Sequence, residues 1–101
     1  MLTHVVLFKF PERADAEEAR ARLLAMRGRV ETLLEIEAGL DITGSERSYD
    51  LALITRFADQ AGLDAYRVHP VHQEVVAFIR ARSSAVVAVD YLGAPVTSAA
   101  E

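Results

Sequence analysis

The segment that opens the chain, residues 2–10 (LTHVVLFKF), predicts a β-strand that is apolar on both faces. It is rich in β-branched and aromatic residues, and it contains neither glycine nor proline. Successive side chains of a strand point to opposite faces. One face carries His4, Val6, Phe8 and Phe10, and the other carries Val5 and Leu7. A strand of this kind needs an apolar layer on each side, which excludes a sheet with one face in water.

The rest of the chain alternates between helical and strand patterns. Residues 14–37 predict one long helix, with Asp15 as its N-cap and Gly28 tolerated inside it. A polar turn at 46–48 should join two antiparallel strands. Asp59 suits the start of a short helix, and Pro70 suits the first turn of another. The expected elements after the first strand are a helix at 14–37, strands at 40–45 and 49–57, helices at 60–68 and 70–82, and a strand at 84–92.

This order, β-α-β-β-α-β, predicts an α+β, ferredoxin-like domain with a four-stranded antiparallel sheet. Both helical segments should cover the same face of the sheet. The strands at 49–57 and 84–92 are also apolar on both faces, so the second face needs another sheet. We therefore expect a homodimer that packs sheet on sheet and forms a dimeric α/β barrel. A single domain should span residues 1–93, and residues 94–101 should form a flexible tail.

Composition restricts the classes of partner. The chain has 101 residues, a formal net charge of −4 and no cysteine. An excess of acidic residues gives no electrostatic reason to bind nucleic acid. No run of about 18 apolar residues is present, and the N-terminus lacks the pattern of a signal peptide, so we expect a cytoplasmic protein with no membrane segment.

Polar side chains on otherwise apolar elements are the candidates for chemistry. His4 should point toward the helices, near the segment AYRVHPVHQEV at 65–75. His72 would lie at a helix N-terminus, whose positive end favours the neutral imidazole that a general base requires. Tyr66 has a hydroxyl that can donate to a carbonyl or enolate oxygen. Each of these residues also fits a purely structural role at the edge of the core, and His69, just before the proline, fits a capping or packing role.

A metal or cofactor is not expected. Pro70 interrupts the helical register that would place His69 and His72 on one face, and no carboxylate has ligand spacing with them. The chain has no glycine-rich phosphate loop and no nucleophile elbow. The sequence therefore predicts no metal site and no cofactor.

Several segments together resemble the stress-responsive α/β-barrel (Dabb) family over residues 2–92. They are HVVLFKF, YDLALITRFAD, AYRVHPVHQEVVAFIR and the closing VDY, with the run Tyr66-x-x-His69-Pro70-x-His72 as the most specific part. The resemblance implies a ferredoxin-like protomer in a dimeric barrel, in a family whose members mostly have no known activity. In a distantly similar plant branch, the olivetolic acid cyclase type, a pocket between helices and sheet cyclises a polyketide thioester.

The resemblance implies roles for particular residues. His72 would be the general base, Tyr66 would hold the carbonyl oxygen, and His4 would support the pocket. We expect the residues that line the pocket to be His4, Val6, Phe8, Leu23, Met26, Leu53 and Val75. The chain departs from the cyclase pattern where a pocket histidine is replaced by Leu51, and where an aromatic residue and a glycine are replaced by Val75 and Val76. A valine in place of glycine predicts a smaller or filled cavity.

Three hypotheses remain open at this point. The first is a dimeric barrel that binds a small apolar or carbonyl-containing molecule. The second is a cofactor-free lyase or cyclase that acts on a polyketide-like carbonyl substrate through His72 and Tyr66. The third is a related chemistry of ferredoxin-like dimers, such as a cofactor-free monooxygenase. The enzyme hypothesis requires Tyr66, His72 and His4 to converge on a cavity.

Overall fold

A computed structural model describes residues 1–93, and the tail expected at 94–101 lies outside the described residues. The elements follow the predicted order, with the second helical segment divided in two. They are β1 (Leu2–Lys9), α1 (Arg13–Leu24), β2 (Glu35–Leu40), β3 (Leu51–Phe57), α2 (Gln60–Val68), α3 (Pro70–Arg82) and β4 (Ala85–Leu92).

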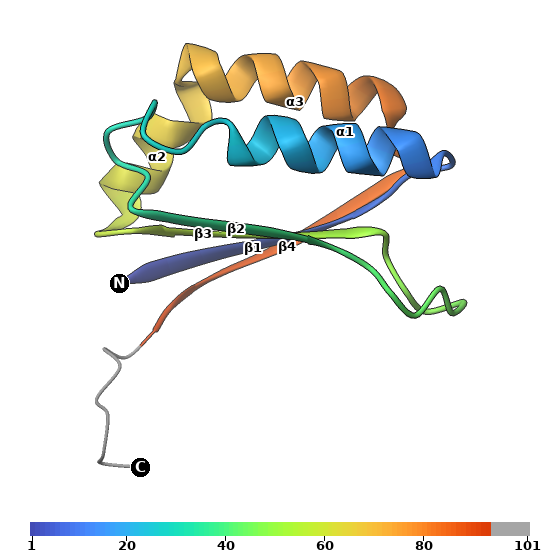
Figure 1. The fold of residues 1–101 in the computed structure, drawn as a ribbon. Coiled ribbons are helices and arrows are strands. Elements are labelled where there is room, and N and C mark those ends of the chain that lie inside the picture. Colours follow the sequence, from blue (N-terminus) through green and yellow to red (C-terminus); the bar gives the residue numbers. More distant parts are fainter. Residues whose placement is uncertain (94–101) are drawn as a thin grey trace.

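The four strands form one antiparallel sheet in the order β2-β3-β1-β4, and all three helices lie on one face of it (Figure 1). This is the ferredoxin-like α+β arrangement, so the predicted fold class is confirmed. Helix α1 packs through Ala16, Ala19 and Leu23, which are buried at helical spacing. The small alanines allow the helix to approach the sheet closely.

The long helix predicted at 14–37 is wrong after Leu24. The chain turns over residues 25–34, where Gly28 adopts a positive φ of 80° that other residues rarely adopt. The chain then enters β2, where Ile36 and Ala38 are buried and Glu35 and Glu37 are exposed. This alternation of charged and apolar residues is typical of a strand, although these residues fall within the long helix predicted from the sequence.

The second and third strands along the chain, β2 and β3, are also connected differently from the prediction. The second strand ends at Leu40 instead of occupying 40–45, and a loop of residues 41–50 replaces the short turn at 46–48. The carboxylate of Asp41 accepts hydrogen bonds from the backbone N–H groups of Thr43 and Gly44. This local bonding competes with strand pairing, which explains why the strand ends there. Helix α1 begins after Glu12, so the predicted N-cap, Asp15, lies in its first turn instead.

Pro70 divides α2 from α3, as predicted. It is the first residue of α3, and His69 before it has the extended ψ of 136° that a residue preceding proline favours. The Nδ1 atom of His69 accepts a hydrogen bond from the backbone N–H of Val71 at 3.1 Å. The capping role expected for His69 is therefore present in the structure.

The core lies between the helices and the inner face of the sheet, and the outer face is open. Leu51, Leu53 and Phe57 alternate along β3 and are buried beneath the helices. On the outer face of β4, Val87, Val89 and Tyr91 are 46%, 57% and 48% exposed. No described helix covers these residues, which agrees with the two-faced pattern of the sequence (Figure 1).

Candidate functional site

A cavity of about 350 Å³ opens between α3 and the inner face of the sheet. Strand β1 forms its floor, with contributions from β3 and β4, and α3 forms its opposite wall. It is mainly apolar, with polar groups near the junction of α2 and α3 and again near the C-terminal end of α3. The lining residues are His4, Val6, Phe8, Leu23, Leu53, Tyr66, Arg67, His72, Val75, Val76, Ile79, Arg80, Ser83, Val86 and Ala88.

Tyr66 occupies the polar end of this cavity and is fully buried. Its ring packs against Phe57 with the centroids 5.0 Å apart, and its hydroxyl is buried without a hydrogen-bond partner in residues 1–93. Burial raises the pKa of Tyr66 far above its usual range, so the phenol stays protonated and able to donate. A buried hydroxyl without a partner costs free energy that a ligand with an acceptor atom would recover.

His72 lies on the first turn of α3, beside Tyr66, with the two ring centroids 4.1 Å apart. Its Nδ1 is 3.2 Å from the backbone carbonyl of Arg67, which can only accept, so Nδ1 carries the proton in the neutral ring. Burial lowers the pKa of His72 below 6.5; the bond to the Arg67 carbonyl opposes this effect, and nearby cationic groups add to it. The neutral ring therefore keeps a lone pair on Nε2 near pH 7, as a general base requires.

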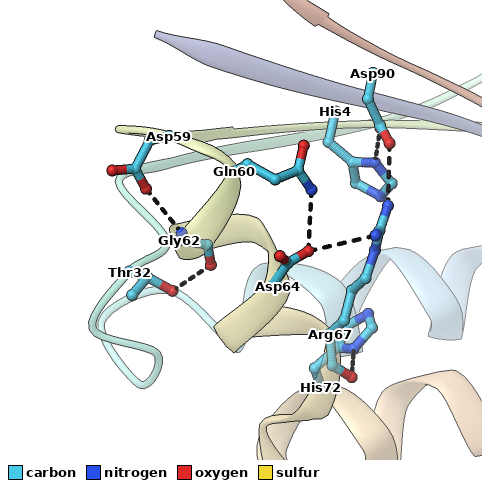
Figure 2. Close-up of polar contacts among 9 residues, drawn as sticks. All are labelled: His4, Thr32, Asp59, Gln60, Gly62, Asp64, Arg67, His72 and Asp90. Atoms are coloured by element: carbon cyan, nitrogen blue, oxygen red, sulfur yellow. Dashed lines mark hydrogen bonds and ion pairs between the residues drawn. The ribbon is translucent and has the colours of Figure 1, made fainter.

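His4 is fixed at the same end of the cavity by Asp90 and Arg67 (Figure 2). His4 and Asp90 are cross-strand partners of β1 and β4, and Nδ1 of His4 forms a hydrogen bond with the Asp90 carboxylate. Arg67 donates to the other carboxylate oxygen at 3.0 Å and lies 3.7 Å from Asp64. The Arg67 guanidinium is therefore paired with two carboxylates of the protein, Asp64 and Asp90.

The structure brings together most of the residues predicted for the site. His4, Tyr66 and His72 line one cavity, as do Val6, Phe8, Leu23, Leu53 and Val75. Met26 does not line it; the residue is 1% exposed and belongs to the packed core. Val75 and Val76 face the cavity without filling it, so the complete filling that the valines suggested does not occur.

Several lining residues were missed by the sequence reasoning. These include Ile79 and Arg80 on α3 and Ser83 directly after it, which continue the stripe of His72 and Val75 at helical spacing. That spacing is visible in the sequence and would have identified them. The pairing of Asp90 with His4 depends on strand register, which the sequence alone does not give.

Within residues 1–93, no helix is long and apolar enough to cross a membrane. The same residues contain no group of three or more His, Asp or Glu side chains arranged to hold a metal ion.

The family model of the Stress responsive A/B Barrel Domain (Dabb) matches residues 2–92, and the chain belongs to this family. An uncharacterised protein of Streptomyces coelicolor is 32% identical over 96 residues, which cover 90% of this chain and 98% of that protein.

Solved structures share the fold. A dimeric ferredoxin-like protein of unknown function from Bacteroides fragilis superposes with a TM-score of 0.81 and 22% identity, over 89% of this chain and 93% of that one. A hydroxynitrile lyase from Passiflora edulis superposes with a TM-score of 0.80 and 12% identity, over 96% of both chains. At these identities the likeness shows the fold alone.

Proposed function

We propose that the protein binds a small, mainly apolar molecule with a carbonyl group in the cavity beneath α3. The single observation that supports this most strongly is the buried, unpartnered hydroxyl of Tyr66 at the end of an apolar cavity. A carbonyl oxygen accepts the hydrogen bond that this hydroxyl lacks, and the remaining ligand atoms take the apolar wall. A volume of about 350 Å³ falls at the small end of the usual range of about 300–1,000 Å³, which favours a small ligand.

Binding in this way couples the ligand to His72. The Tyr66 hydroxyl is fully buried, so a ligand oxygen reaches it only after a neighbouring side chain moves. His72 is half-buried and packs on the Tyr66 ring, so its imidazole adjoins the position of a ligand that reaches the hydroxyl. The imidazole would then lie beside the carbonyl group of the ligand.

A pair of matched ligands tests the binding proposal. One is a medium-chain methyl ketone, and the other is the alkene in which a methylene group replaces the carbonyl oxygen. Calorimetric titration should show that Tyr66→Phe weakens ketone binding about threefold to tenfold, the value of one neutral hydrogen bond, and leaves alkene binding unchanged. Equal losses for both ligands would contradict the role assigned to the hydroxyl.

A second candidate function is proton transfer next to a carbonyl, as in a cofactor-free lyase or cyclase that acts on a polyketide-like substrate. It is favoured by the neutral His72, whose Nδ1–H is held by the Arg67 carbonyl. In this reaction Nε2 of His72 removes a proton from the carbon next to the carbonyl, and Tyr66 stabilises the negative charge that develops on the oxygen. The Passiflora lyase supports it only by showing that this fold can hold a lyase site.

Isotope exchange tests this second candidate without a known substrate. In heavy water, an enolising site replaces the hydrogens next to the carbonyl of the bound methyl ketone with deuterium. Wild-type protein should accelerate this exchange, His72→Gln should remove the acceleration, and His69→Gln should keep it because His69 caps α3. Exchange that is equal in wild type and His72→Gln would rule out His72 as the base and leave the binding proposal intact.

We further propose that two copies associate through the outer faces of their sheets. The exposed Val87, Val89 and Tyr91 support this, as does the description of the Bacteroides protein as dimeric. Light scattering at micromolar concentration should give a dimer for wild type. Val89→Lys should give a monomer, and Val68→Lys should not, because Val68 is 74% exposed on a helix. A monomeric wild type would contradict this association.

A further inference from the structure

The cavity has a second polar end, formed by Arg80 in the last turn of α3 and by Ser83, the residue that follows the helix. These residues lie three positions apart, so they share the helix face that also carries His72 and Val76. Arg80 is exposed at the rim of the cavity, and Ser83 is half-buried. The wall between the two polar ends is apolar and includes Val76 and Ile79.

Within residues 1–93 the Arg80 guanidinium forms no ion pair, whereas the guanidinium groups of Arg82 and Arg22 each do. Arg82 lies 3.7 Å from the Asp15 carboxylate and stacks on Phe78, and Arg22 pairs with Glu18 at 2.9 Å. Among residues 1–93, no carboxylate or carbonyl group accepts a hydrogen bond from the Arg80 guanidinium, and the Ser83 hydroxyl likewise has no partner there.

From this arrangement we propose that the ligand carries a carboxylate at the end remote from its carbonyl group, bound by Arg80 and Ser83. The inference rests on the proposed binding of a carbonyl group at Tyr66, and it narrows the ligand class to elongated oxo acids. Guanidinium and carboxylate groups form charge-assisted hydrogen bonds of matching geometry. The C-terminal end of a helix carries partial negative charge, so an anion is held there only through the charge of Arg80.

The helix sets the length of such a ligand. Residues 72 and 80 are separated by eight positions, and a rise of about 1.5 Å per residue places their Cα atoms about 12 Å apart. Side chains on a helix lean toward its N-terminus, which brings the guanidinium of Arg80 somewhat closer to His72. A linear oxo acid of medium chain length spans this interval, whereas a short keto acid does not.

Two probes separate the carboxylate site from the carbonyl site. The first is the oxodecanoic acid that has a methyl ketone at the end opposite its carboxylate, and the second is its methyl ester. Their affinities are measured by calorimetric titration on wild type, Arg80→Gln, Arg29→Gln and Tyr66→Phe. Arg29 is exposed, does not line the cavity and forms no ion pair within residues 1–93, so its variant controls for the change in net charge.

The acid should bind wild type at least about fivefold more tightly than the ester, and the preference should weaken at high salt. Arg80→Gln should remove the preference by weakening acid binding far more than ester binding, whereas Arg29→Gln should preserve it. Tyr66→Phe should weaken both probes equally. Equal binding of acid and ester to wild type, with both still sensitive to Tyr66→Phe, would overturn the carboxylate site alone. Failure of both probes to bind would overturn it together with the proposed function.

Discussion

The rings of Tyr66 and His72 pack at a centroid distance of 4.1 Å with a tilt of 38°, although Pro70 places them on different helices. The proline ends α2 and starts α3, so the last turn of one helix faces the first turn of the next. A phenol donor and a neutral imidazole thereby meet at one end of an apolar cavity. This contact is the basis of the binding and proton-transfer proposals.

Two substitutions at Tyr66 should have opposite effects on stability. Tyr66→Phe removes a buried hydroxyl that has no partner, so the free energy of unfolding should stay the same or rise by about 1 kcal/mol. Tyr66→Ala leaves a cavity in the core and should cost about 3–5 kcal/mol. Urea denaturation monitored by circular dichroism measures both. A marked loss of stability in Tyr66→Phe would mean that the hydroxyl has a partner in solution.

The pH dependence of stability should report on His72. Because burial lowers its pKa in the folded chain below 6.5, the unfolded chain binds the proton first as the pH falls. Above about pH 7 the ring is neutral in both the folded and the unfolded chain, so its titration does not change the free energy of unfolding there. Stability should therefore decrease as the pH falls from 6.5 through the pKa of the folded state. Comparison with His72→Gln isolates the effect, and a difference between the two proteins that is constant with pH would contradict it.

Thr55 should tolerate the loss of its hydroxyl. It is fully buried on the inner face of β3, and its Oγ1 has no hydrogen-bond partner within residues 1–93. Thr55→Val should raise the free energy of unfolding by about 1 kcal/mol. Thr55→Ser, which keeps the hydroxyl and deletes the methyl group, should lower it by about the same amount. Thermal unfolding with the two variants in the wrong order would show that the hydroxyl is bonded.

Asp90 should act as the residue that positions His4. Asp90→Asn removes the charge that pairs with both His4 and Arg67, and it should cost about 1 kcal/mol because the carboxylate is partly exposed. Arg67→Gln should cost less, since Arg67 is the more exposed partner. Urea titration at low and high salt measures the two costs. If Asp90→Asn caused no more loss than Arg67→Gln, the pairing with His4 would contribute nothing.

The sequence predicted β1, β3, β4 and the divided helix well because their signals are local, whereas it misplaced β2. The apolar strands, Asp59 and Pro70 each act within a few residues, and α2 and α3 begin and end where expected. The turn after Leu24 was missed because the leucines at 33 and 34 continue a helical stripe. In the sequence, only Gly28 and the alternation of charged and apolar residues over Glu35–Ala38 oppose that stripe. In the structure Gly28 adopts a positive φ.

The candidate site was harder to predict for a different reason. Tyr66 and His72 are near in sequence, but the partnership of His4 with Asp90 depends on strand register across 86 residues. Met26 shows a different limit of prediction from helical spacing. Its helical spacing is right for an inward side chain, yet spacing does not say whether that side chain reaches a cavity or only the packed core.

The most direct measurement of the central claim is the infrared stretching frequency of a ligand carbonyl in the cavity. An isotope-labelled methyl ketone bound to wild type should show the band shifted to lower frequency than in an apolar solvent, because Tyr66 donates a hydrogen bond to the oxygen. Bound to Tyr66→Phe, the same ketone should show the apolar-solvent frequency. An unshifted carbonyl band in the wild-type complex would contradict the role of the Tyr66 hydroxyl as the ligand anchor.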